Sequence, residues 1–415
     1  MRKRMTAALL SLALALSPLL SGCGGPPRLQ ARDLMAEVPA PKVPVDAQMT
    51  EDAAAAVMDF CVRLFQEGGV EGEHTLISPV SVLYALAMAA NGAQGDTLEQ
   101  MEAVLGLPLL ELNEFCRAWL AALPEEDGAL SIANSLWFRD SEMLTVEESF
   151  LEANALWYGA DVYEAPFDDA TVSDVNAWVD YHTGGMIPAI LEEIPENAMV
   201  YLVNALAFDG RWETPYREYQ VRAGTFTRED GTVREAELMY STEDWYLSDG
   251  KAQGFLKYYE GCDYAFAALL PPEGVPLADY IASLDGQKLA RVLDGAGREE
   301  VQAAIPKFEM AYSAELSWAL QSMGMTDAFA PSAADFSAMG RSERGPLFIT
   351  QVLHRTFLSV DEEGTRAAAA TAVVTGDSGE PVEPKKVYLD RPFLCLLLDC
   401  GTGLPLFLGA VTDVG

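Results

Sequence analysis

Ser378 has the sequence setting most typical of a catalytic nucleophile, because it lies within Gly376-Asp377-Ser378-Gly379. A serine nucleophile needs a histidine base, and that base needs an aspartate to orient it. The chain has three histidines, His74, His182 and His354. None of them lies in the Ala-Ala-His-Cys setting that accompanies such a serine. The sequence therefore argues against a serine hydrolase, and we expect no enzymatic activity.

Metal and cofactor chemistry also lack the residues they need. No HExxH motif and no cluster of carboxylates with histidines occurs. Apart from Cys23, the cysteines are scattered and show no CxxC spacing; they are Cys61, Cys116, Cys262, Cys395 and Cys400. Cys61, Cys116 and Cys395 lie among apolar residues and are expected to be buried thiols. A Cys395–Cys400 disulfide is left open, and no metal or cofactor is expected.

The charge of the chain limits its partners. Lys and Arg number 27, Asp and Glu number 63, and the net charge is -36 over 415 residues. Nucleic acid is not expected as a partner, since phosphate binding needs clustered basic side chains. The acidity suits a protein that stays soluble outside the cell. Half of the residues are hydrophobic, which is enough for a large core.

The N-terminal residues resemble a targeting segment. Residues 1–22 combine a basic start with a short apolar stretch, as in a signal peptide. The motif Leu20-Ser21-Gly22-Cys23 resembles a bacterial lipobox, which implies a lipid on Cys23 and an extracellular protein held on the cell membrane. An ordinary signal peptide with a chance cysteine is the alternative. Residues 23–48, rich in Pro and Gly, are expected to be a linker to a domain at 49–415.

Hydrophobic periodicity predicts helices early in the chain and strands late. Helices are expected over residues 49–67, 76–90, 97–105, 172–183 and 311–323, and strands over 129–138, 199–208, 254–259, 264–270, 393–398 and 404–411. Ser78-Pro79 suits the start of a helix. The nearly unbroken apolar run at 199–208 indicates a strand buried on both faces. Because helices and strands do not alternate regularly, an α+β fold with mainly antiparallel sheets is expected.

A series of short motifs occurs in a fixed order along residues 50–413. They include Leu76-Ile77-Ser78-Pro79, Asn134-Ser135-Leu136-Trp137, Val203-Asn204-Ala205, Gly210-Arg211-Trp212, Ile305-Pro306-Lys307-Phe308, Val352-Leu353-His354 and Arg391-Pro392-Phe393. Together they resemble the serpin family, and residues 360–374 resemble the reactive-loop hinge of its inhibitory members. The resemblance implies a serpin fold: three β-sheets, a large central one among them, about eight or nine helices, and an exposed loop at about 362–386.

The resemblance also implies a mechanism, in which the loop is cleaved and enters the central sheet as a strand while the protease stays attached as an acyl-enzyme. The hinge residues suit this movement. Glu362 and Glu363 lead to Gly364, which supplies a flexible pivot. Strand periodicity then places small side chains on one face, which can enter a packed sheet; they are Thr365, Ala367, Ala369 and Thr371. Taken alone, the alanine run would indicate a helix.

Two groups of supporting residues follow from the resemblance. The first, here called the shutter, is a buried polar cluster beneath the opening sheet and consists of Ser78, Ser81, Asn204 and His354. The second, here called the breach, lies where the loop first enters and consists of Lys307, Trp212 and Glu362. A Lys307–Glu362 ion pair with Trp212 packed alongside is expected to hold the sheet closed until cleavage. Because an exposed pair stabilises a fold by only about 0–1 kcal/mol, its role would be gating more than stability.

The position of the bond to be cleaved is less well defined. The family's spacing counted from Glu362 gives Ser378-Gly379, while counting back from Pro392 gives Pro381-Val382. We expect Ser378-Gly379, within a window that also holds Asp377, Glu380 and Pro381, because a bond after proline is a poor substrate. Residues 367–384 contain no Lys or Arg, which disfavours a trypsin-like target. Small residues suit elastase-like or subtilisin-like enzymes, and Glu380 leaves a glutamate-specific protease open.

The expected partner is a serine protease, or alternatively a cysteine protease, in a 1:1 covalent complex with a monomeric chain. The main alternative is a non-inhibitory serpin that acts as a binding or structural protein. It would share every motif except a loop that inserts.

Overall fold

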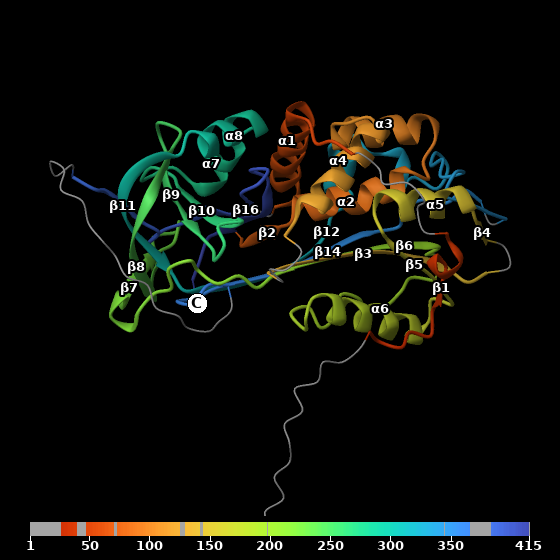
Figure 1. Cartoon of the computed structure of the whole chain (residues 1–415), viewed down its shortest axis with the longest axis horizontal. Coiled ribbons are helices and arrows are strands. Elements are labelled where there is room, and N and C mark those ends of the chain that lie inside the picture. Colours follow the sequence, from red (N-terminus) through yellow and green to blue (C-terminus); the bar gives the residue numbers. More distant parts are fainter. Residues whose placement is uncertain are drawn as a thin grey trace, which may run out of the picture.

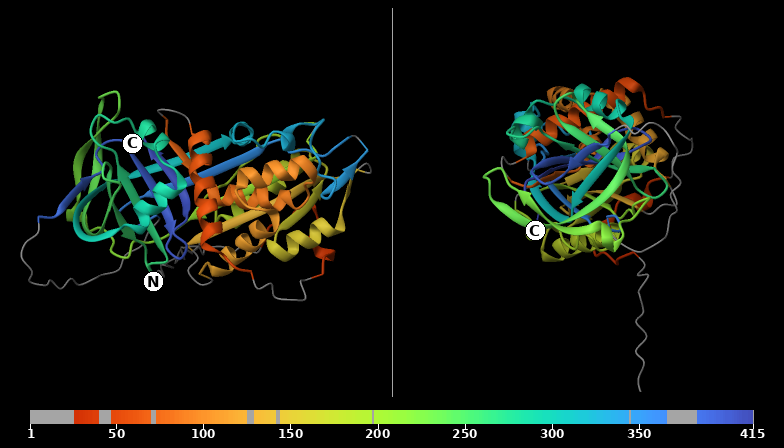
Figure 2. Two further views of the ribbon diagram at one scale, coloured as in Figure 1. Left: turned by 90° about the horizontal axis from the view of Figure 1, so that it is seen from above. Right: turned by 90° about the vertical axis from the view of Figure 1, so that its left-hand side faces the viewer.

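The computed structural model describes residues 26–39, 47–69, 73–124, 129–141, 144–196, 198–343, 345–365 and 383–414. These residues form nine α-helices and three β-sheets in an elongated body (Figure 1). Figure 2 shows the largest sheet at one end of the body, helices α2 to α5 at the other, and α1 between them. The expected α+β class, with three sheets, is confirmed.

The bounds of the elements are as follows. The helices are α1 (Glu51–Gly68), α2 (Pro79–Ala90), α3 (Gly95–Leu105), α4 (Leu109–Ala122), α5 (Glu148–Trp157), α6 (Asp169–His182), α7 (Leu277–Ala282), α8 (Gly286–Asp294) and α9 (Ser317–Ser322). The strands are β1 (Arg32–Asp33), β2 (Thr75–Ile77), β3 (Leu130–Arg139), β4 (Leu144–Val146), β5 (Asp161–Ala165), β6 (Val200–Phe208), β7 (Val221–Thr227), β8 (Val233–Ser248), β9 (Gln253–Tyr258), β10 (Tyr264–Leu270), β11 (Gly297–Pro306), β12 (Phe308–Glu315), β13 (Gly340–Ser342), β14 (Val352–Val360), β15 (Lys385–Tyr388), β16 (Phe393–Asp399) and β17 (Pro405–Val411).

The central sheet has six strands in the order β1-β5-β3-β6-β14-β12. Helix α2 covers one face of this sheet and α6 covers the other (Figure 1). All nine residues of β6 are buried, as the sequence predicted. Alternate side chains explain this burial: Tyr201 and Val203 pack with α6, and Leu202 and Leu206 join the larger core on the opposite face.

A nine-stranded sheet follows the order β15-β11-β8-β9-β10-β16-β17-β2, with β7 paired to β8. The predicted hairpin over 254–270 is confirmed as antiparallel β9 and β10. The strands β10, β16 and β17 are buried along their whole length. A small sheet pairs β13 with β4.

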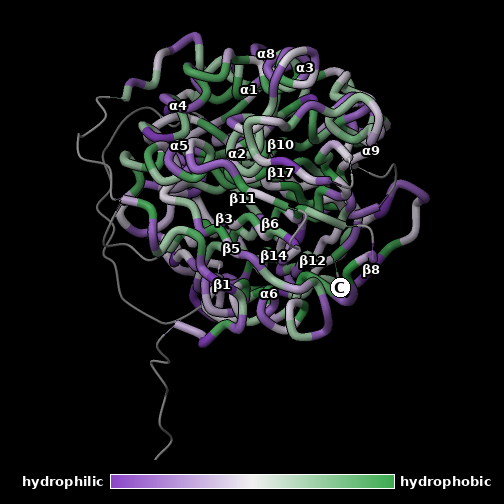
Figure 3. Tube along the Cα trace, turned by 90° about the vertical axis from the view of Figure 1, so that its right-hand side faces the viewer, coloured by the Kyte–Doolittle hydropathy of each residue, from purple (hydrophilic) through white to green (hydrophobic). Residues whose placement is uncertain are grey.

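Helix α2 is apolar on all sides, which predicts a fully buried helix. All twelve of its residues are buried. Figure 3 shows the same pattern for the whole chain, with hydrophobic segments inside and hydrophilic ones mostly outside. Pro79 begins the helix as expected, but residues 76–77, which were predicted as helix, belong to β2 and pair with β17.

The predicted helix over 311–323 is wrong in its first half. Residues 308–315 form β12, which pairs with β14 in antiparallel register from Phe308 opposite Val360 to Glu315 opposite Leu353. Helix α9 begins only at Ser317. Buried and exposed side chains alternate at Phe308, Glu309 and Met310, the period of a half-buried strand.

The expected linker over 23–48 is wrong for residues 26–39, which pack on the folded body. Arg32 and Asp33 form β1 at the edge of the central sheet, paired with β5. The backbone N–H groups of Gln30 and Ala31 donate to the carboxylate of Asp174 on α6, at 2.7 and 2.8 Å. Cys23 and the remainder of the expected targeting segment lie outside the described residues. In the part of the chain that is described, no helix combines the length and apolar character needed to span a membrane.

Candidate functional site at the top of the central sheet

The pairing between β6 and β14 covers only part of the two strands. They run parallel, and residues 352–356 pair with residues 202–206. Strand β6 continues to Phe208 and β14 continues to Val360, beyond the last of these pairs. Since the two strands are parallel, one strand running in the opposite direction could lie between them and form an antiparallel pair with each. The ends of β6 and β14 beyond residues 206 and 356 are therefore not paired with each other.

A cleft of about 260 Å³ opens where the pairing ends. Its lining comes from β6, β12, β14, the segment after β14 and the turn after α6: Gly185, Met186, Phe208, Glu309, Phe357, Ser359, Asp361 and Thr365. The residues that follow β14 thus lie at the mouth of the gap between β6 and β14.

The chain turns sharply after β14, at the pivot predicted from the sequence. Asp361 Oδ1 accepts hydrogen bonds from the N–H groups of Glu363 (2.8 Å) and Gly364 (3.1 Å). Gly364 has a φ of 151°, and a β-carbon there would clash with the carbonyl oxygen of Gly210. Only glycine fits both the backbone angle and this close approach.

Thr365, the first residue of the predicted inserting face, is already inside the cleft. Its side chain is 2% exposed. Its N–H donates to the carbonyl of Gly210 at 2.7 Å, and its hydroxyl lies 3.0 Å from the hydroxyl of Tyr259. Gly364 forms an antiparallel bridge with Arg211 beside this contact. The hinge is therefore docked against residues 210–212 in the described state.

Trp212 and Tyr216 hold the residues just before the pivot. The Trp212 N–H donates to the carbonyl of Glu363 at 3.0 Å, and its indole N–H donates to the carbonyl of Asp361 at 2.9 Å. The Tyr216 N–H donates to the carbonyl of Glu362 at 2.7 Å. The Trp212 ring stacks on Tyr259 with centroids 4.4 Å apart. Three hydrogen bonds therefore connect residues 212–216 to the base of the loop.

The expected breach ion pair is present. Lys307 Nζ lies 2.8 Å from Glu362 and 3.3 Å from Glu237. The hydrogen bond from Lys307 is the main cause of a lowered pKa at Glu362. For Lys307, burial alone would lower the pKa, but the two carboxylates outweigh it and the pKa is raised. Trp212 belongs to the same region through its bonds to residues 361 and 363.

The four shutter residues lie together beneath the paired part of β6 and β14. Ser81 Oγ donates to Asn204 Oδ1 at 2.7 Å, and the Ser78 N–H donates to His354 Nε2 at 3.0 Å. Asn204 and His354 are register partners across the two strands. Asn204 Nδ2 also donates to Asn134 Oδ1 at 2.6 Å, so Asn134 of β3 joins this network.

The imidazole of His354 is 1% exposed, and burial lowers its pKa to about 3. It is therefore neutral at physiological pH. Since Nε2 accepts the bond from Ser78, Nδ1 carries the proton. Among the described residues, neither His354 Nδ1 nor Ser78 Oγ has a hydrogen-bond partner.

The remaining predicted loop residues fall outside the described part of the chain: Ala367, Ala369, Thr371, Asp377, Ser378, Gly379, Glu380 and Pro381. The chain is described again from residue 383 and forms β15, an edge strand parallel to β11. The loop therefore connects the end of β14 in the central sheet to β15 at the edge of the nine-stranded sheet.

The other residues considered for catalysis or metal binding lie apart from one another in the structure. His74 Nδ1 accepts a hydrogen bond from Thr412, and His182 lies beside Asp161 on the far face of the central sheet. The described residues contain no cluster of His, Cys, Asp and Glu that could hold a metal. Cys395 and Cys400 are free thiols in this structure, with Cys395 buried and Cys400 exposed.

Several functional contacts could not be identified from the sequence. Tyr216 and Tyr259 lie far from the hinge along the chain, and only the fold brings them to it; Asn134 of β3 is likewise brought to the shutter residue Asn204 only by the fold. Asn134 lies in a motif that the sequence did single out, which was the one available signal.

Comparisons with known proteins agree with this geometry. A family model described as "Serpin (serine protease inhibitor)" matches residues 55–414. An uncharacterised serpin-like protein of Thermococcus kodakarensis is 31% identical over 368 residues, which cover 86% of this chain and 85% of that protein. Rat neuroserpin is 28% identical over 359 residues, covering 82% of this chain and 86% of neuroserpin.

Solved structures match as well. Tengpin, a thermophilic serpin, is 41% identical in its native state, with a TM-score of 0.89 and coverage of 93% of this chain and 100% of tengpin. Its latent state gives a TM-score of 0.79 with 38% identity, covering 89% of this chain. The described fold is thus more similar to the native form of that protein than to its latent form.

Proposed function

We propose, from the premise that this chain belongs to the serpin family, that it inhibits a protease by acting as a suicide substrate. Members of this family are in general serine protease inhibitors and not catalysts. What we add is the mechanism for this chain: the loop is cleaved, its N-terminal part enters the central sheet between β6 and β14, and the protease is held in a covalent 1:1 complex.

The observation that carries this proposal is the docked hinge. Thr365 is buried in the cleft at the end of the β6–β14 pairing, and Gly364 provides the turn that directs the chain toward it. A strand that continued from Thr365 down the sheet would run antiparallel to β14. It would give hydrogen-bond partners to the facing edges of both strands. The small residues expected at 367, 369 and 371 would then face the packed core without overpacking it.

The covalent step follows ordinary acyl-transfer chemistry. The hydroxyl of the protease serine attacks the carbonyl carbon of Ser378, and an ester forms while the peptide bond to Gly379 breaks. The proton from the serine passes through the protease histidine to the new amino group of Gly379. Insertion of the loop would then carry the attached protease away before water hydrolyses the ester.

The target class is inferred from the loop sequence. Residues 367–384 hold no Lys or Arg, so a protease with a specificity pocket for basic side chains would have no anchor there. Elastase-like and subtilisin-like serine proteases fit the small residues best. A glutamate-specific protease would cleave after Glu380 instead.

A lipid anchor at Cys23 remains part of the proposal, supported by Leu20-Ser21-Gly22-Cys23. It would hold the inhibitor on the outside of the cell membrane. Residues 24–25 and 40–46 lie outside the described region. Labelling with a radioactive fatty acid in a bacterial host tests this, because a Cys23→Ala variant should lose the label.

Incubation of residues 26–415 with pancreatic elastase, subtilisin and trypsin tests the inhibitory function. A denaturant-stable 1:1 band with elastase or subtilisin, and a released peptide that starts at Gly379, would support suicide inhibition and locate the bond. Cleavage by every protease without a covalent band would favour the non-inhibitory alternative.

A further inference from the structure

Lys257 is a buried cation directly behind the breach. It lies on β9, opposite Phe266 on β10, and its side chain is 3% exposed. A buried ammonium is costly unless it is paired and hydrogen-bonded. The contacts that compensate Lys257 therefore indicate what it holds in place.

Those contacts converge on the segment that grips the loop. Lys257 Nζ lies 3.0 Å from Glu243 Oε1 on β8 and donates to the carbonyl of Thr214 at 3.2 Å. The same ammonium lies 5.3 Å from the ring centroid of Trp212 and 4.5 Å from that of Tyr216. Both distances are within the range of cation–π attraction, which is stronger where water is excluded.

Trp212 and Tyr216 supply three of the hydrogen bonds that hold the base of the loop. Their backbone N–H groups donate to the carbonyls of Glu363 and Glu362, and the Trp212 indole donates to the carbonyl of Asp361. Among the described residues, Lys257 forms its polar and ring contacts with Glu243, Thr214, Trp212 and Tyr216, and none with residues 361–365. It fixes residues 212–216 to the nine-stranded sheet, and residues 212–216 fix the hinge.

We propose that Lys257 is a positioning residue for the breach, which holds residues 212–216 in the geometry that keeps the uncleaved loop out of the sheet. The role rests on the proposed function, because it concerns the rate at which the hinge is released. Without the ammonium, Trp212 and Tyr216 lose a common anchor, and the three hydrogen bonds to residues 361–363 break more often. The uncleaved loop then enters the sheet spontaneously at a higher rate.

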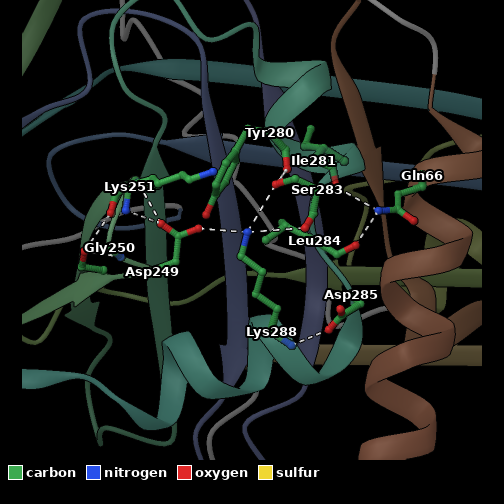
Figure 4. Close-up of polar contacts among 12 residues, drawn as sticks. Gln66, Asp249, Gly250, Lys251, Tyr280, Ile281, Ser283, Leu284, Asp285 and Lys288 are labelled. Carbon is green, nitrogen blue, oxygen red and sulfur yellow. Dashed lines mark hydrogen bonds and ion pairs between the residues drawn. The ribbon is translucent and has the colours of Figure 1, made fainter.

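A second lysine, Lys288 on α8, provides a matched control. Lys288 Nζ lies 3.1 Å from Asp249, whose side chain is 3% exposed, and 5.7 Å from the ring centroid of Tyr280. Figure 4 shows this pair between α8, the segment after α7 and the turn after β8, with Lys288 also directed toward Ser283. It combines a carboxylate, a backbone carbonyl and a ring, as Lys257 does, but it contacts no residue of the breach.

The experiment compares two double variants that each remove both charges of a pair, so that no buried charge is left alone. They are Lys257→Met with Glu243→Gln, and Lys288→Met with Asp249→Asn. The uncleaved proteins are held at elevated temperature, and conversion to the inserted form is followed as loss of protease inhibition and gain of urea resistance. The first variant is expected to convert about tenfold faster than the unaltered chain, a change of about 1.4 kcal/mol in the activation barrier; the second is expected to convert at an unchanged rate.

Two further measurements separate positioning from general stability. Under the proposed mechanism, insertion would carry the hinge away from residues 212–216, so the cleaved forms of the two double variants should unfold at similar urea concentrations. Tyr216→Leu removes one of the rings that Lys257 contacts and keeps the N–H donor to Glu362, so it should also accelerate conversion.

Equal conversion rates for the two double variants would overturn the role of Lys257, even if the unaltered chain inserts its loop. If the unaltered chain gains no stability on loop cleavage, the proposed function itself fails, and the role of Lys257 fails with it.

Discussion

The hydroxyl oxygens of Thr365, which lines the cleft at the end of the β6–β14 pairing, and of Tyr259 lie 3.0 Å apart, although 106 residues separate them in sequence. Tyr259 follows β9 in the nine-stranded sheet, and its ring stacks on Trp212. The first residue beyond the pivot is thus bound on the core side before any cleavage occurs. Under the proposed mechanism, this contact and the turn at Gly364 would direct the inserting strand.

If the chain acts as proposed, replacement of Thr365 with arginine should convert it from an inhibitor into a substrate. A guanidinium at this buried position would have to enter the sheet without a partner, and burying an unpaired charge costs several kcal/mol. The covalent complex with subtilisin should disappear from denaturing gels, while cleavage of the loop continues. Thr365→Ser is the matched control, because it keeps the hydroxyl that contacts Tyr259, and it should still form the complex. A covalent band of normal strength with Thr365→Arg would contradict insertion of this face.

Replacement of Gly364 with alanine should destabilise the uncleaved form by about 1–3 kcal/mol. The new β-carbon would clash with the carbonyl of Gly210, in addition to the strain of a positive φ. Gly274 also has a positive φ, of 79°, but a β-carbon there would meet no atom within 4 Å. Gly274→Ala should therefore cost only the backbone strain, roughly 1 kcal/mol. Thermal unfolding measures the loss of stability in both variants. Equal losses in Gly364→Ala and Gly274→Ala would show that the close approach to Gly210 is unimportant.

Stability should fall as the pH is lowered from 6.5 toward 3, because of His354. Burial lowers the pKa of folded His354 to about 3, whereas the unfolded chain takes up a proton at its ordinary value of about 6.5. Over this interval the unfolded state binds more protons, so the free energy of unfolding falls by up to about 1.4 kcal/mol per pH unit. Urea unfolding at pH 7.0 and pH 5.0 measures the change.

The His354→Gln variant should show a smaller loss between these two pH values than the unaltered chain. Burial also lowers the pKa of His182, but that residue is partly exposed on the far face of the sheet. His182→Gln should therefore alter the pH dependence less than His354→Gln does. Identical pH dependence in the unaltered chain and His354→Gln would mean that His354 is not a buried neutral imidazole.

Replacement of Glu362 with glutamine should change the rate of spontaneous loop insertion more than it changes stability. The side chains of Lys307 and Glu362 are 28% and 39% exposed, so the pair contributes at most about 1 kcal/mol. Lys307 also keeps Glu237 as a partner. The pair lies at the release point of the hinge, however, and its loss should let the hinge leave more often.

Glu147→Gln is the control for that variant. It breaks another exposed ion pair, between Glu147 and Arg341 on β13, which is attached to neither the breach nor the loop. Conversion of the uncleaved protein to a urea-resistant form should accelerate with Glu362→Gln and remain unchanged with Glu147→Gln. If both variants convert at the rate of the unaltered chain, the ion pair has no gating role.

Much of the fold could be predicted because burial leaves a strong pattern in the sequence. The unbroken apolar run of β6 and the Ser78-Pro79 start of the buried helix were both recognisable. The segment 311–315 was misassigned because Ala311 to Leu320 also has helical spacing, and its pairing with β14 depends on residues 38 or more positions away. The docking of residues 26–39 was missed because their composition is that of a linker, while the Asp174 carboxylate that binds them lies on α6.

The site was predictable only in part, and mainly through the resemblance to one family. Lys307, Glu362 and Trp212 were expected to lie near one another, and the fold brings them to one end of the sheet. Lys257, Tyr216 and Tyr259 were not expected, since a lysine or a tyrosine within an apolar strand gives no sign of the loop it will support. Their contribution depends on tertiary contacts between the two large sheets.

Hydrogen–deuterium exchange across β6 and β14, before and after cleavage of the loop, tests the central claim most directly. The account predicts slower exchange in residues 200–208 and 352–360 of the cleaved protein, because an added strand would supply hydrogen-bond partners and exclude water from both edges. Thr365→Arg should cancel this change. Unchanged or faster exchange in both strands of the cleaved, unaltered chain would contradict insertion between β6 and β14.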